Sequence, residues 1–208
     1  MSATFEPLTP ERRRQQTRDH LLAAAAQVFA ERGFHGASLD AVAAAAGFSK
    51  GAVYSNFKNK EDLFLALLES AYTREMESVR ATLDASEVPA EARLTDFLPL
   101  ILAGSDQSLP PETWAGLYME FALFAMRHPA ARRRIAELDE ANIAAVAELI
   151  SEENSGFKDP ESIRREARIV EALFRGIWFM KVLDPDAVDE ALLESALAFV
   201  TRALTSRT

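Results

Sequence analysis

The sequence contains no cysteine among its 208 residues, which excludes disulfide bonds, thiolate zinc sites and cysteine nucleophiles. Histidine is scarce as well: His20, His35 and His128 are the only three, and they stand at no metal-ligand spacing. The sequence has no glycine-rich phosphate loop, nucleophile elbow or paired His/carboxylate helix motif. We therefore expect no catalytic residues, no metal site and no cofactor, and a protein that is not an enzyme.

Long apolar runs are absent too. No stretch approaches the ~18 apolar residues that a membrane-spanning helix needs, and the N-terminal segment has no apolar core of signal-peptide length. We expect a soluble, cytoplasmic protein. Glycine is limited to eight residues, alanine is abundant and no stretch alternates with a period of two, so the pattern predicts an all-α fold.

The charge is unevenly distributed along the chain. The net charge is −9, which taken alone argues against a nucleic-acid partner. Residues 1–60, however, hold eight Lys and Arg against five Asp and Glu, so this segment carries +3 and the remainder −12. Such asymmetry indicates a polyanion-binding end on an acidic body, although a chance fluctuation of this size is about as frequent.

Apolar periodicity and capping residues divide the chain into helices. Ser38, Ser49 and Asn59 are expected N-caps, and Gly33 and Gly47 are expected turns with positive φ. The predicted helices are Pro10–Arg32, a short helix between Ser38 and Ala46, a second between Ser49 and Phe57, a long helix from Asn59 to Leu83, and then Ala90–Ala103, Glu112–Arg127, Ala130–Glu153, Glu161–Leu183 and Ala187–Thr205.

The two short helices around Gly47 form the most informative segment. Val42, Phe48 and Val53 are placed to lock the helices together, as in a helix-turn-helix. The second helix then projects side chains that are small or form hydrogen bonds, with one positive charge. A helix that enters the major groove of DNA needs such a face. The projecting residues are Lys50, Gly51, Ala52, Tyr54 and Asn56.

Residues 17–39 read TRDHLLAAAAQVFAERGFHGASL, and residues 46–63 read AGFSKGAVYSNFKNKEDL. These segments resemble the N-terminal DNA-binding domain of regulators of the tetracycline-repressor (TetR) family. The resemblance covers about a quarter of the chain, and its Gly-x-Val-Tyr-x-Asn-Phe-x-Asn-Lys-Glu-x-Leu tail is highly specific. It implies a three-helix DNA-binding domain with a helix-turn-helix over residues 1–60 and a helical effector-binding and dimerisation domain over residues 61–208.

The resemblance also implies roles for matching residues in binding double-stranded DNA. Lys50, Gly51 and Ala52 would face the bases. Tyr54, Asn56 and Lys60 would contact phosphates, with Thr17, Arg18 and Ser38 as weaker candidates. Two alternatives stay open: Tyr54 packs partly against the first helix, and Asn56 caps its own helix. The basic run Arg12–Arg14 is a further candidate for phosphate or minor-groove contact.

For the C-terminal part, the resemblance implies a homodimer that forms through the last two helices and binds a near-palindromic operator. It also implies a repressor that a small molecule releases from DNA. We expect a largely apolar cavity between the helices Ala90–Ala103, Glu112–Arg127 and Glu161–Leu183, although an aromatic stripe at helical spacing is more often core. The candidate pocket residues are Phe97, Ile101, Trp114, Leu117, Tyr118, Glu120, Phe121, Phe124, Phe174, Arg175 and Trp178.

The sequence leaves alternatives open for the roles of some charged residues and for the function. Glu120 and Arg175 interrupt apolar runs, either as a structural ion pair or solvent-facing edge or as polar anchors for a ligand. The run Arg132–Arg134 is followed by Glu137, Asp139 and Glu140, and local pairing at spacings of three and four residues is expected there in place of a second DNA site. A ligand-independent regulator or an activator of the same fold is the alternative function.

Overall fold

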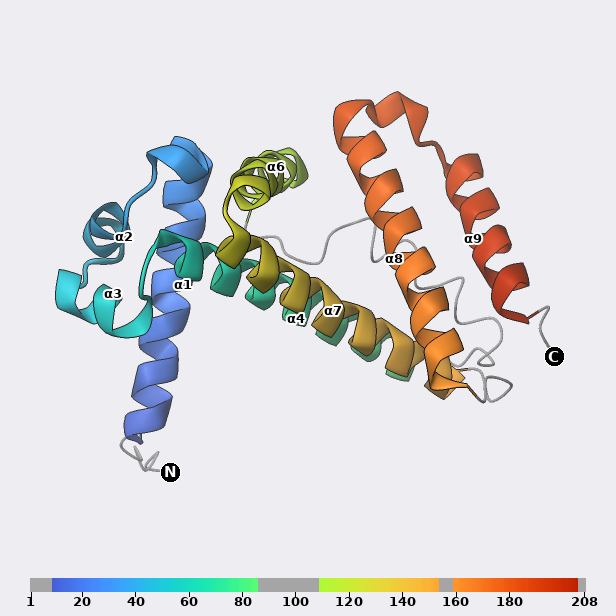
Figure 1. Cartoon of the computed structure of the whole chain (residues 1–208), viewed down its shortest axis with the longest axis horizontal. Coiled ribbons are helices and arrows are strands. Elements are labelled where there is room, and N and C mark those ends of the chain that lie inside the picture. Colours follow the sequence, from blue (N-terminus) through green and yellow to red (C-terminus); the bar gives the residue numbers. More distant parts are fainter. Residues whose placement is uncertain (1–8, 86–108, 154–158, 206–208) are drawn as a thin grey trace, which may run out of the picture. The chain divides into compact units, whose positions relative to one another are not determined.

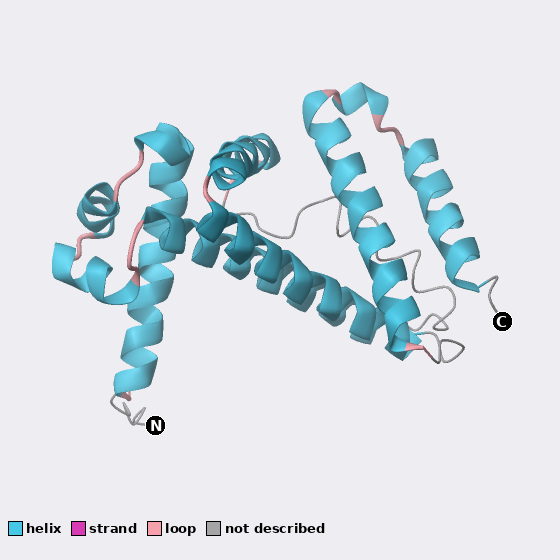
Figure 2. Cartoon of the chain, in the orientation of Figure 1, coloured by secondary structure: helices cyan, strands magenta, loops and turns pink. Residues whose placement is uncertain are grey.

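The computed structural model describes residues 9–85, 109–153 and 159–205. Within these ranges the chain contains helices and no strand, which confirms the all-α prediction (Figure 2). The predicted helix Ala90–Ala103 lies outside the described residues, and so do the pocket candidates Phe97 and Ile101. The helices are α1 (Pro10–Gly36), α2 (Leu39–Ala46), α3 (Lys50–Asn56), α4 (Lys60–Ala85), α6 (Pro111–Arg127), α7 (Pro129–Glu153), α8 (Pro160–Leu183), the 3₁₀ turn η1 (Pro185–Ala187) and α9 (Glu190–Thr205) (Figure 1).

The chain forms two compact units, residues 1–68 and 69–208. The division falls inside α4, eight residues after the boundary that the sequence suggested. The first unit contains α1, α2, α3 and the beginning of α4, and the second contains the rest of the chain. Each unit has its own packing and is described separately.

The helix ends of the first unit follow from local side-chain chemistry. The Ser38 hydroxyl accepts a hydrogen bond from the Ala41 N–H, and the Ser49 hydroxyl accepts one from the Ala52 N–H, both at 3.2 Å. Between them, Gly47 adopts a left-handed conformation with φ 69° and ψ 22°. Each cap satisfies a backbone group that the first or last helical turn leaves unpaired, so three residues define the helix-turn-helix.

Gly33 breaks α1 where the sequence predicted a stop, but in a different way. Its φ is 67° and its ψ is 173°, which is not the left-handed helical conformation expected of a cap. The chain then makes one further helical turn through Gly36, and the Ala37 N–H donates to the Gly33 carbonyl at 3.2 Å. A positive φ favours glycine at position 33, because a side chain there would be strained.

A compact aromatic core holds the first unit together. Phe29 and Phe34 are fully buried, and each ring contacts Phe64 edge-on at a centroid distance of 5.4 Å. Val42 and Val53 are also fully buried, so α2 and α3 are fixed through their inner faces. The predicted lock between the two short helices is therefore confirmed for these valines, while Phe48 is half-buried. With its inner face held, α3 presents its opposite face outward.

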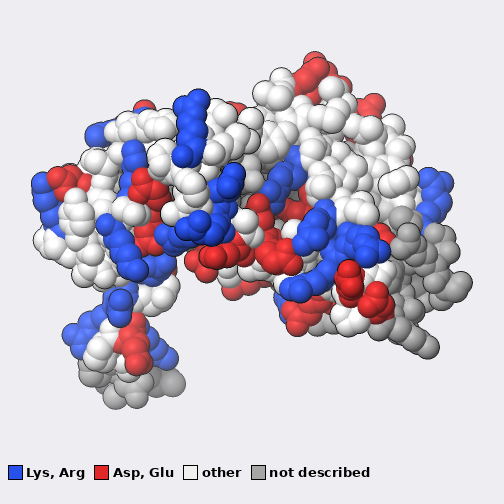
Figure 3. All heavy atoms as spheres, in the orientation of Figure 1, with Lys and Arg blue, Asp and Glu red and all other residues white. Residues whose placement is uncertain are grey.

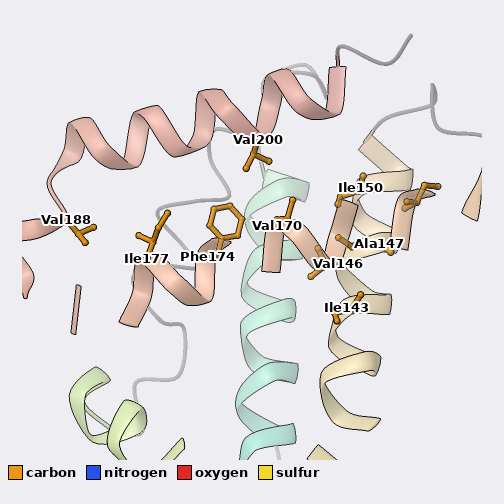
Figure 4. Close-up of a cluster of buried hydrophobic side chains, with 11 residues drawn as sticks. Ile143, Val146, Ala147, Ile150, Val170, Phe174, Ile177, Val188 and Val200 are labelled. Carbon is orange, nitrogen blue, oxygen red and sulfur yellow. The ribbon is translucent and has the colours of Figure 1, made fainter. Parts of the chain in front are cut away.

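The second unit is built from α6, α7, α8 and α9 with the later turns of α4. Helix α7 packs against both α6 and α8, and α8 also contacts α6 and η1. An aliphatic cluster joins α7, α8 and α9, with Phe174 and Ile177 at its centre (Figure 4). The predicted pocket residue Phe174 thus lies in this core at 3% exposure, among Ile143, Val146, Val170, Val188 and Val200.

Candidate nucleic-acid interface

The outward face of α3 is small near its start and polar beyond. Lys50, Gly51 and Tyr54 are exposed, Ala52 is half-buried, and Val53 anchors the helix from beneath. A Cβ built on Gly51 would meet only the Ser49 hydroxyl oxygen, at 3.8 Å. Packing within the unit therefore leaves room for a larger residue at position 51, and the missing side chain instead lets another molecule approach the backbone closely.

Lys50 pairs with Asp40, a residue that the sequence analysis did not single out. The Lys50 ammonium donates a hydrogen bond to the Asp40 carboxylate, and the two side chains are 68% and 46% exposed. This hydrogen bond and the attraction of the carboxylate raise the pKa of Lys50, so the amine stays protonated. The pair joins the first turn of α2 to the first turn of α3 on the surface of the helix-turn-helix.

Asn56 and Lys60 are engaged within the unit. The Asn56 amide donates to the Ala52 carbonyl at 2.8 Å, so its side chain bonds to its own helix one turn earlier. The Lys60 ammonium donates to the His35 carbonyl at 2.9 Å and lies 4.8 Å from the centre of the Phe34 ring. An ammonium has three donors, so Lys60 retains hydrogen-bonding capacity toward a phosphate.

The weaker candidates also have structural roles. Ser38 caps α2, and the Thr17 hydroxyl donates to the Arg13 carbonyl at 3.0 Å. The Arg18 guanidinium lies 4.7 Å from the centre of the Phe57 ring, which ties α1 to the end of α3. The run Arg12–Arg14 belongs to the first turns of α1 and is exposed, and Figure 3 shows basic side chains around this end of the helix.

The second unit contains a polar cluster centred on Arg175 of α8. Its guanidinium donates to the Tyr118 hydroxyl of α6 at 2.8 Å and to the Tyr72 hydroxyl of α4 at 3.4 Å. It also forms ion pairs with Asp139 of α7 at 3.2 Å and with Glu171 one turn earlier on α8 at 2.8 Å. Helices α4, α6, α7 and α8 are therefore connected through one side chain that is only about a quarter exposed.

Protonation within this cluster is fixed by its surroundings. Burial raises the pKa of Tyr72 well above its usual range, so its hydroxyl remains a donor and donates to Asp139 at 3.3 Å. Burial lowers the pKa of Arg175, but the surrounding tyrosine and carboxylate oxygens more than reverse this effect and leave its pKa raised. Two carboxylates and one guanidinium give the cluster a formal charge of −1.

The other predicted pocket residues occupy mixed positions along α6 and α8. Trp114, Leu117 and Phe121 are buried, whereas Tyr118, Glu120, Phe124 and Trp178 are half-buried. Trp114 stands one turn before Tyr118 on α6. The Trp114 indole Nε1–H is buried and has no hydrogen-bond partner among the described residues. A buried donor without a partner costs about 1–3 kcal/mol, which a ligand acceptor would offset.

An apolar stripe runs along the outside of α8. Ile169, Met180 and Leu183 are 52%, 49% and 83% exposed, and the exposed Ala172 and Gly176 lie between them at spacings of three and four residues. On α9, Phe199 is 59% exposed. By contrast, Leu193 and Leu197 of α9 pack against the unit's own core. We call the exposed stripe of α8 the apolar face.

Comparison with known families assigns both parts of the chain. Residues 21–67 match the family model "Bacterial regulatory proteins, tetR family". Residues 89–206, more than half of the chain, match the model "BetI-type transcriptional repressor, C-terminal". The chain belongs to the TetR family. This confirms the predicted family and places the helix-turn-helix of α2 and α3 in a transcriptional regulator with a helical C-terminal domain.

Curated relatives match mainly over the N-terminal region. The chain is 40% identical over 70 residues to the HTH-type transcriptional activator FasR of Mycolicibacterium smegmatis, a match that covers 34% of the chain and 32% of FasR. It is 31% identical over 93 residues to the HTH-type transcriptional repressor DhaR of Mycobacterium sp., covering 45% and 47%. The chain thus spans about a third of the length of FasR and about half of the length of DhaR, one of which is an activator and the other a repressor.

Solved structures share the whole fold. The fatty acid degradation regulator FadR from Bacillus halodurans aligns over 96% of this chain and 99% of its own, with a TM-score of 0.68 and 21% identity. FadR from Bacillus subtilis in complex with stearoyl-CoA aligns over 88% and 97%, with a TM-score of 0.57 and 20% identity. These likenesses concern the fold alone.

In the ranges that the structure describes, every helix is too short or too polar to cross a membrane.

Proposed function

We propose that this TetR-family chain is a sequence-specific DNA-binding repressor that acts as a homodimer and that a small, largely apolar effector releases from its operator. The observation that carries the DNA-binding part is the outward face of α3. Its side chains are small or polar, stand on a helix whose other face is locked by Val53, and include the exposed Lys50 and Tyr54. A rigid helix of this kind enters the major groove, where base edges are read.

The roles differ along α3. Lys50 stands at the first turn, next to Gly51, where the backbone can approach base edges. Tyr54 stands one turn later, is 55% exposed, and carries a hydroxyl that suits a phosphate oxygen. Lys60, at the first turn of α4, adds a positive charge whose free donors suit a second phosphate. The operator is then a near-palindrome whose half-sites are about one helical turn, roughly 34–36 Å, apart.

Two single substitutions test this division of roles. Tyr54→Phe removes one hydroxyl and is expected to weaken binding to all DNA sequences by about 2–12-fold per half-site, since a hydrogen bond contributes roughly 0.5–1.5 kcal/mol. Lys50→Ala is expected to loosen the base preference at one position by about 1–3 kcal/mol of discrimination. Selection from a randomised duplex library, followed by quantitative binding at two salt concentrations, measures both effects.

The control is Ser55→Ala, because Ser55 is exposed on α3 but its hydroxyl already donates to the Ala52 carbonyl at 2.9 Å. It is expected to leave base preference unchanged. A Lys50→Ala profile that matches the wild-type profile at every base position would contradict base reading by Lys50. Equal binding of wild-type protein to operator and to random DNA would contradict sequence-specific binding as a whole.

For effector binding, the supporting observations are the Arg175 cluster and Trp114. Trp114 and Tyr118 lie one turn apart on α6, and Tyr118 contacts both Arg175 and the Phe179 ring, the latter at a centroid distance of 6.1 Å. The buried Trp114 Nε1–H offers a donor to a ligand, and the aromatic rings offer an apolar lining. FadR from Bacillus subtilis, which shares the fold, has been solved with stearoyl-CoA.

A thermal-shift screen of apolar small molecules tests this part. An effector is expected to raise the melting temperature and to lower operator affinity, and operator DNA should lower effector affinity by the same factor, because the two equilibria are linked. The control is Trp114→Phe, which removes the indole donor and should weaken effector binding but not operator binding. A ligand that stabilises the protein and leaves operator affinity unchanged would favour the alternative, a ligand-independent regulator or an activator.

A further inference from the structure

The pair of Asp40 and Lys50 occupies a position that contributes little to folding. Both side chains are largely exposed, and an exposed ion pair stabilises a protein only weakly. Lys50 also stands in the first turn of α3, where the positive end of the helix dipole disfavours a cation. Asp40 compensates for this locally. A stabilising role would be served as well by a neutral residue at position 50, so the pair calls for a different explanation.

The backbone around the pair is rigid. Leu39 and Val42 are buried on either side of Asp40, and Val53 is fully buried three residues after Lys50. The caps at Ser38 and Ser49 fix the first turns of α2 and α3. Both charged side chains therefore project from fixed backbone positions, and the carboxylate favours one direction of the long lysine side chain before DNA binds. This lowers the conformational entropy that Lys50 loses on binding.

The pair still has hydrogen-bonding capacity. Lys50 has one partner among the described residues, Asp40, and an ammonium has three donors. A carboxylate has about four acceptor sites, so Asp40 can accept from a further group. In the major groove, guanine presents the acceptors O6 and N7, and cytosine presents the N4 amino donor. An adjacent ammonium and carboxylate match these two patterns.

We propose that Asp40 and Lys50 act as one base-reading pair, in which Lys50 donates to a guanine and Asp40, supplied by α2, accepts from a cytosine amino group and determines specificity. This rests on the DNA binding proposed above. The Asp40 carboxylate also disfavours complexes with non-specific DNA. It repels the phosphate backbone, so it weakens binding that depends on phosphates alone. Asp40 therefore lowers non-specific affinity while it raises the preference for the operator.

Asp40→Asn tests the proposal, because it removes the charge and keeps the shape. Affinity for random DNA is expected to rise several-fold, and its dependence on salt is expected to become steeper. At the base pair that Asp40 contacts, the preference should move from cytosine toward adenine, which an amide recognises with a donor and an acceptor. The ratio of operator to random affinity should fall roughly 5–150-fold for each half-site.

The measurement is selection from a randomised duplex library with the full-length chain, followed by binding titrations. Glu31→Gln is the matched control, because Glu31 is an exposed acid of α1 in the same unit and its loss changes the net charge equally. It is expected to raise random affinity slightly and to leave the selected sequence unchanged. Circular dichroism and the melting temperature check that both variants fold.

Three further results separate the possible outcomes. If Asp40 acts only by orienting Lys50, Asp40→Asn will have no effect in a Lys50→Ala background, and direct reading by Asp40 is overturned. If Asp40→Asn selects the wild-type sequence and keeps the wild-type ratio of operator to random affinity, base reading by the pair is overturned, while DNA binding stands. If the wild-type protein selects no sequence, the proposed function itself fails.

Discussion

Met180→Glu is expected to convert the proposed dimer into a folded monomer and to lower operator affinity by roughly 10²–10⁴-fold, the gain that linking two binding sites provides. Met180 lies in the apolar face with Ile169 and Leu183 on α8, about half exposed in the single chain. In a two-fold interface every contact occurs twice, so one substitution places two unpaired charges in a desolvated interface. The loss therefore exceeds that of an ordinary surface change.

Leu123→Glu is the matched control. Leu123 belongs to α6 and is 53% exposed, close to the 49% of Met180, but it lies outside the last two helices. The Leu123→Glu variant should remain a dimer and keep its operator affinity. Light scattering gives the mass of each variant in solution, and the dimer interface is expected to bury more than about 1,000 Å². If the Leu123→Glu variant is a monomer and the Met180→Glu variant stays a dimer, the interface lies on α6 and not on α8.

The choice of Met180 depends on the structure. Leu193 and Leu197 of α9 are equally apolar in sequence and belong to the predicted dimer helices, but they pack against the core of their own unit. A charge at either position would unfold the unit and mimic the loss of a dimer interface. Helical periodicity indicates which residues share a face, but it does not say whether that face is covered by the same chain or by a partner.

Local chemistry made most of the fold predictable. Ser38, Ser49 and Asn59 cap the helices that follow them, and Asn59 Oδ1 accepts from the Asp62 N–H at 2.7 Å. Such caps act within four residues, so the sequence contains the whole interaction. The last helix shows the limit: it begins at Glu190 and not at Ala187, because residues 185–187 form a 3₁₀ turn and Asp189 caps α9 at the Leu192 N–H.

The charged contacts were less predictable, because their partners come from other helices. The expected pairing of Arg132–Arg134 within their own helix stays a prediction, but two acids that follow the run pair with another helix. Asp139 pairs with Arg175, and Glu140 pairs with Arg164 and Arg168, all on α8. Helix α7 directs these carboxylates toward α8, and no spacing rule within α7 contains that information.

The same reasoning explains which site residues the sequence revealed. The outward residues of α3 could be predicted because Val53 determines the buried face of a single helix, and the opposite face then points outward. Asp40 was missed because its contact with Lys50 depends on how α2 and α3 cross. For Arg175, the sequence offered only Glu171 at a spacing of four residues, whereas Tyr72, Tyr118 and Asp139 come from three other helices.

Arg175→Met is expected to destabilise the second unit strongly. It leaves Asp139 and Glu171 close together and about three-quarters buried without their shared counter-charge, and it removes donors from two tyrosine hydroxyls. Breaking a buried pair in this way costs about 3 kcal/mol or more. For a chain of this size, that corresponds to a melting temperature roughly 6–12 °C lower.

Arg168→Met provides the comparison on the same helix. Arg168 pairs with Glu140 at 2.6 Å, but both side chains are about half exposed, so the loss is expected to stay below about 1 kcal/mol. Arg175→Lys keeps the charge but not the planar fork that reaches oxygens of four residues, so its loss of stability should lie between those of Arg175→Met and Arg168→Met. Thermal and urea denaturation followed by circular dichroism measure all three variants.

A compensating substitution separates the charge effect from lost packing. If the uncompensated carboxylates cause the loss, Asp139→Asn combined with Arg175→Met should recover part of the stability, although Asp139→Asn alone removes an ion pair. If the double variant is no more stable than Arg175→Met, the loss of stability comes from the lost packing of the arginine side chain. Equal losses for Arg175→Met and Arg168→Met would mean that the cluster does not hold α4, α6, α7 and α8 together.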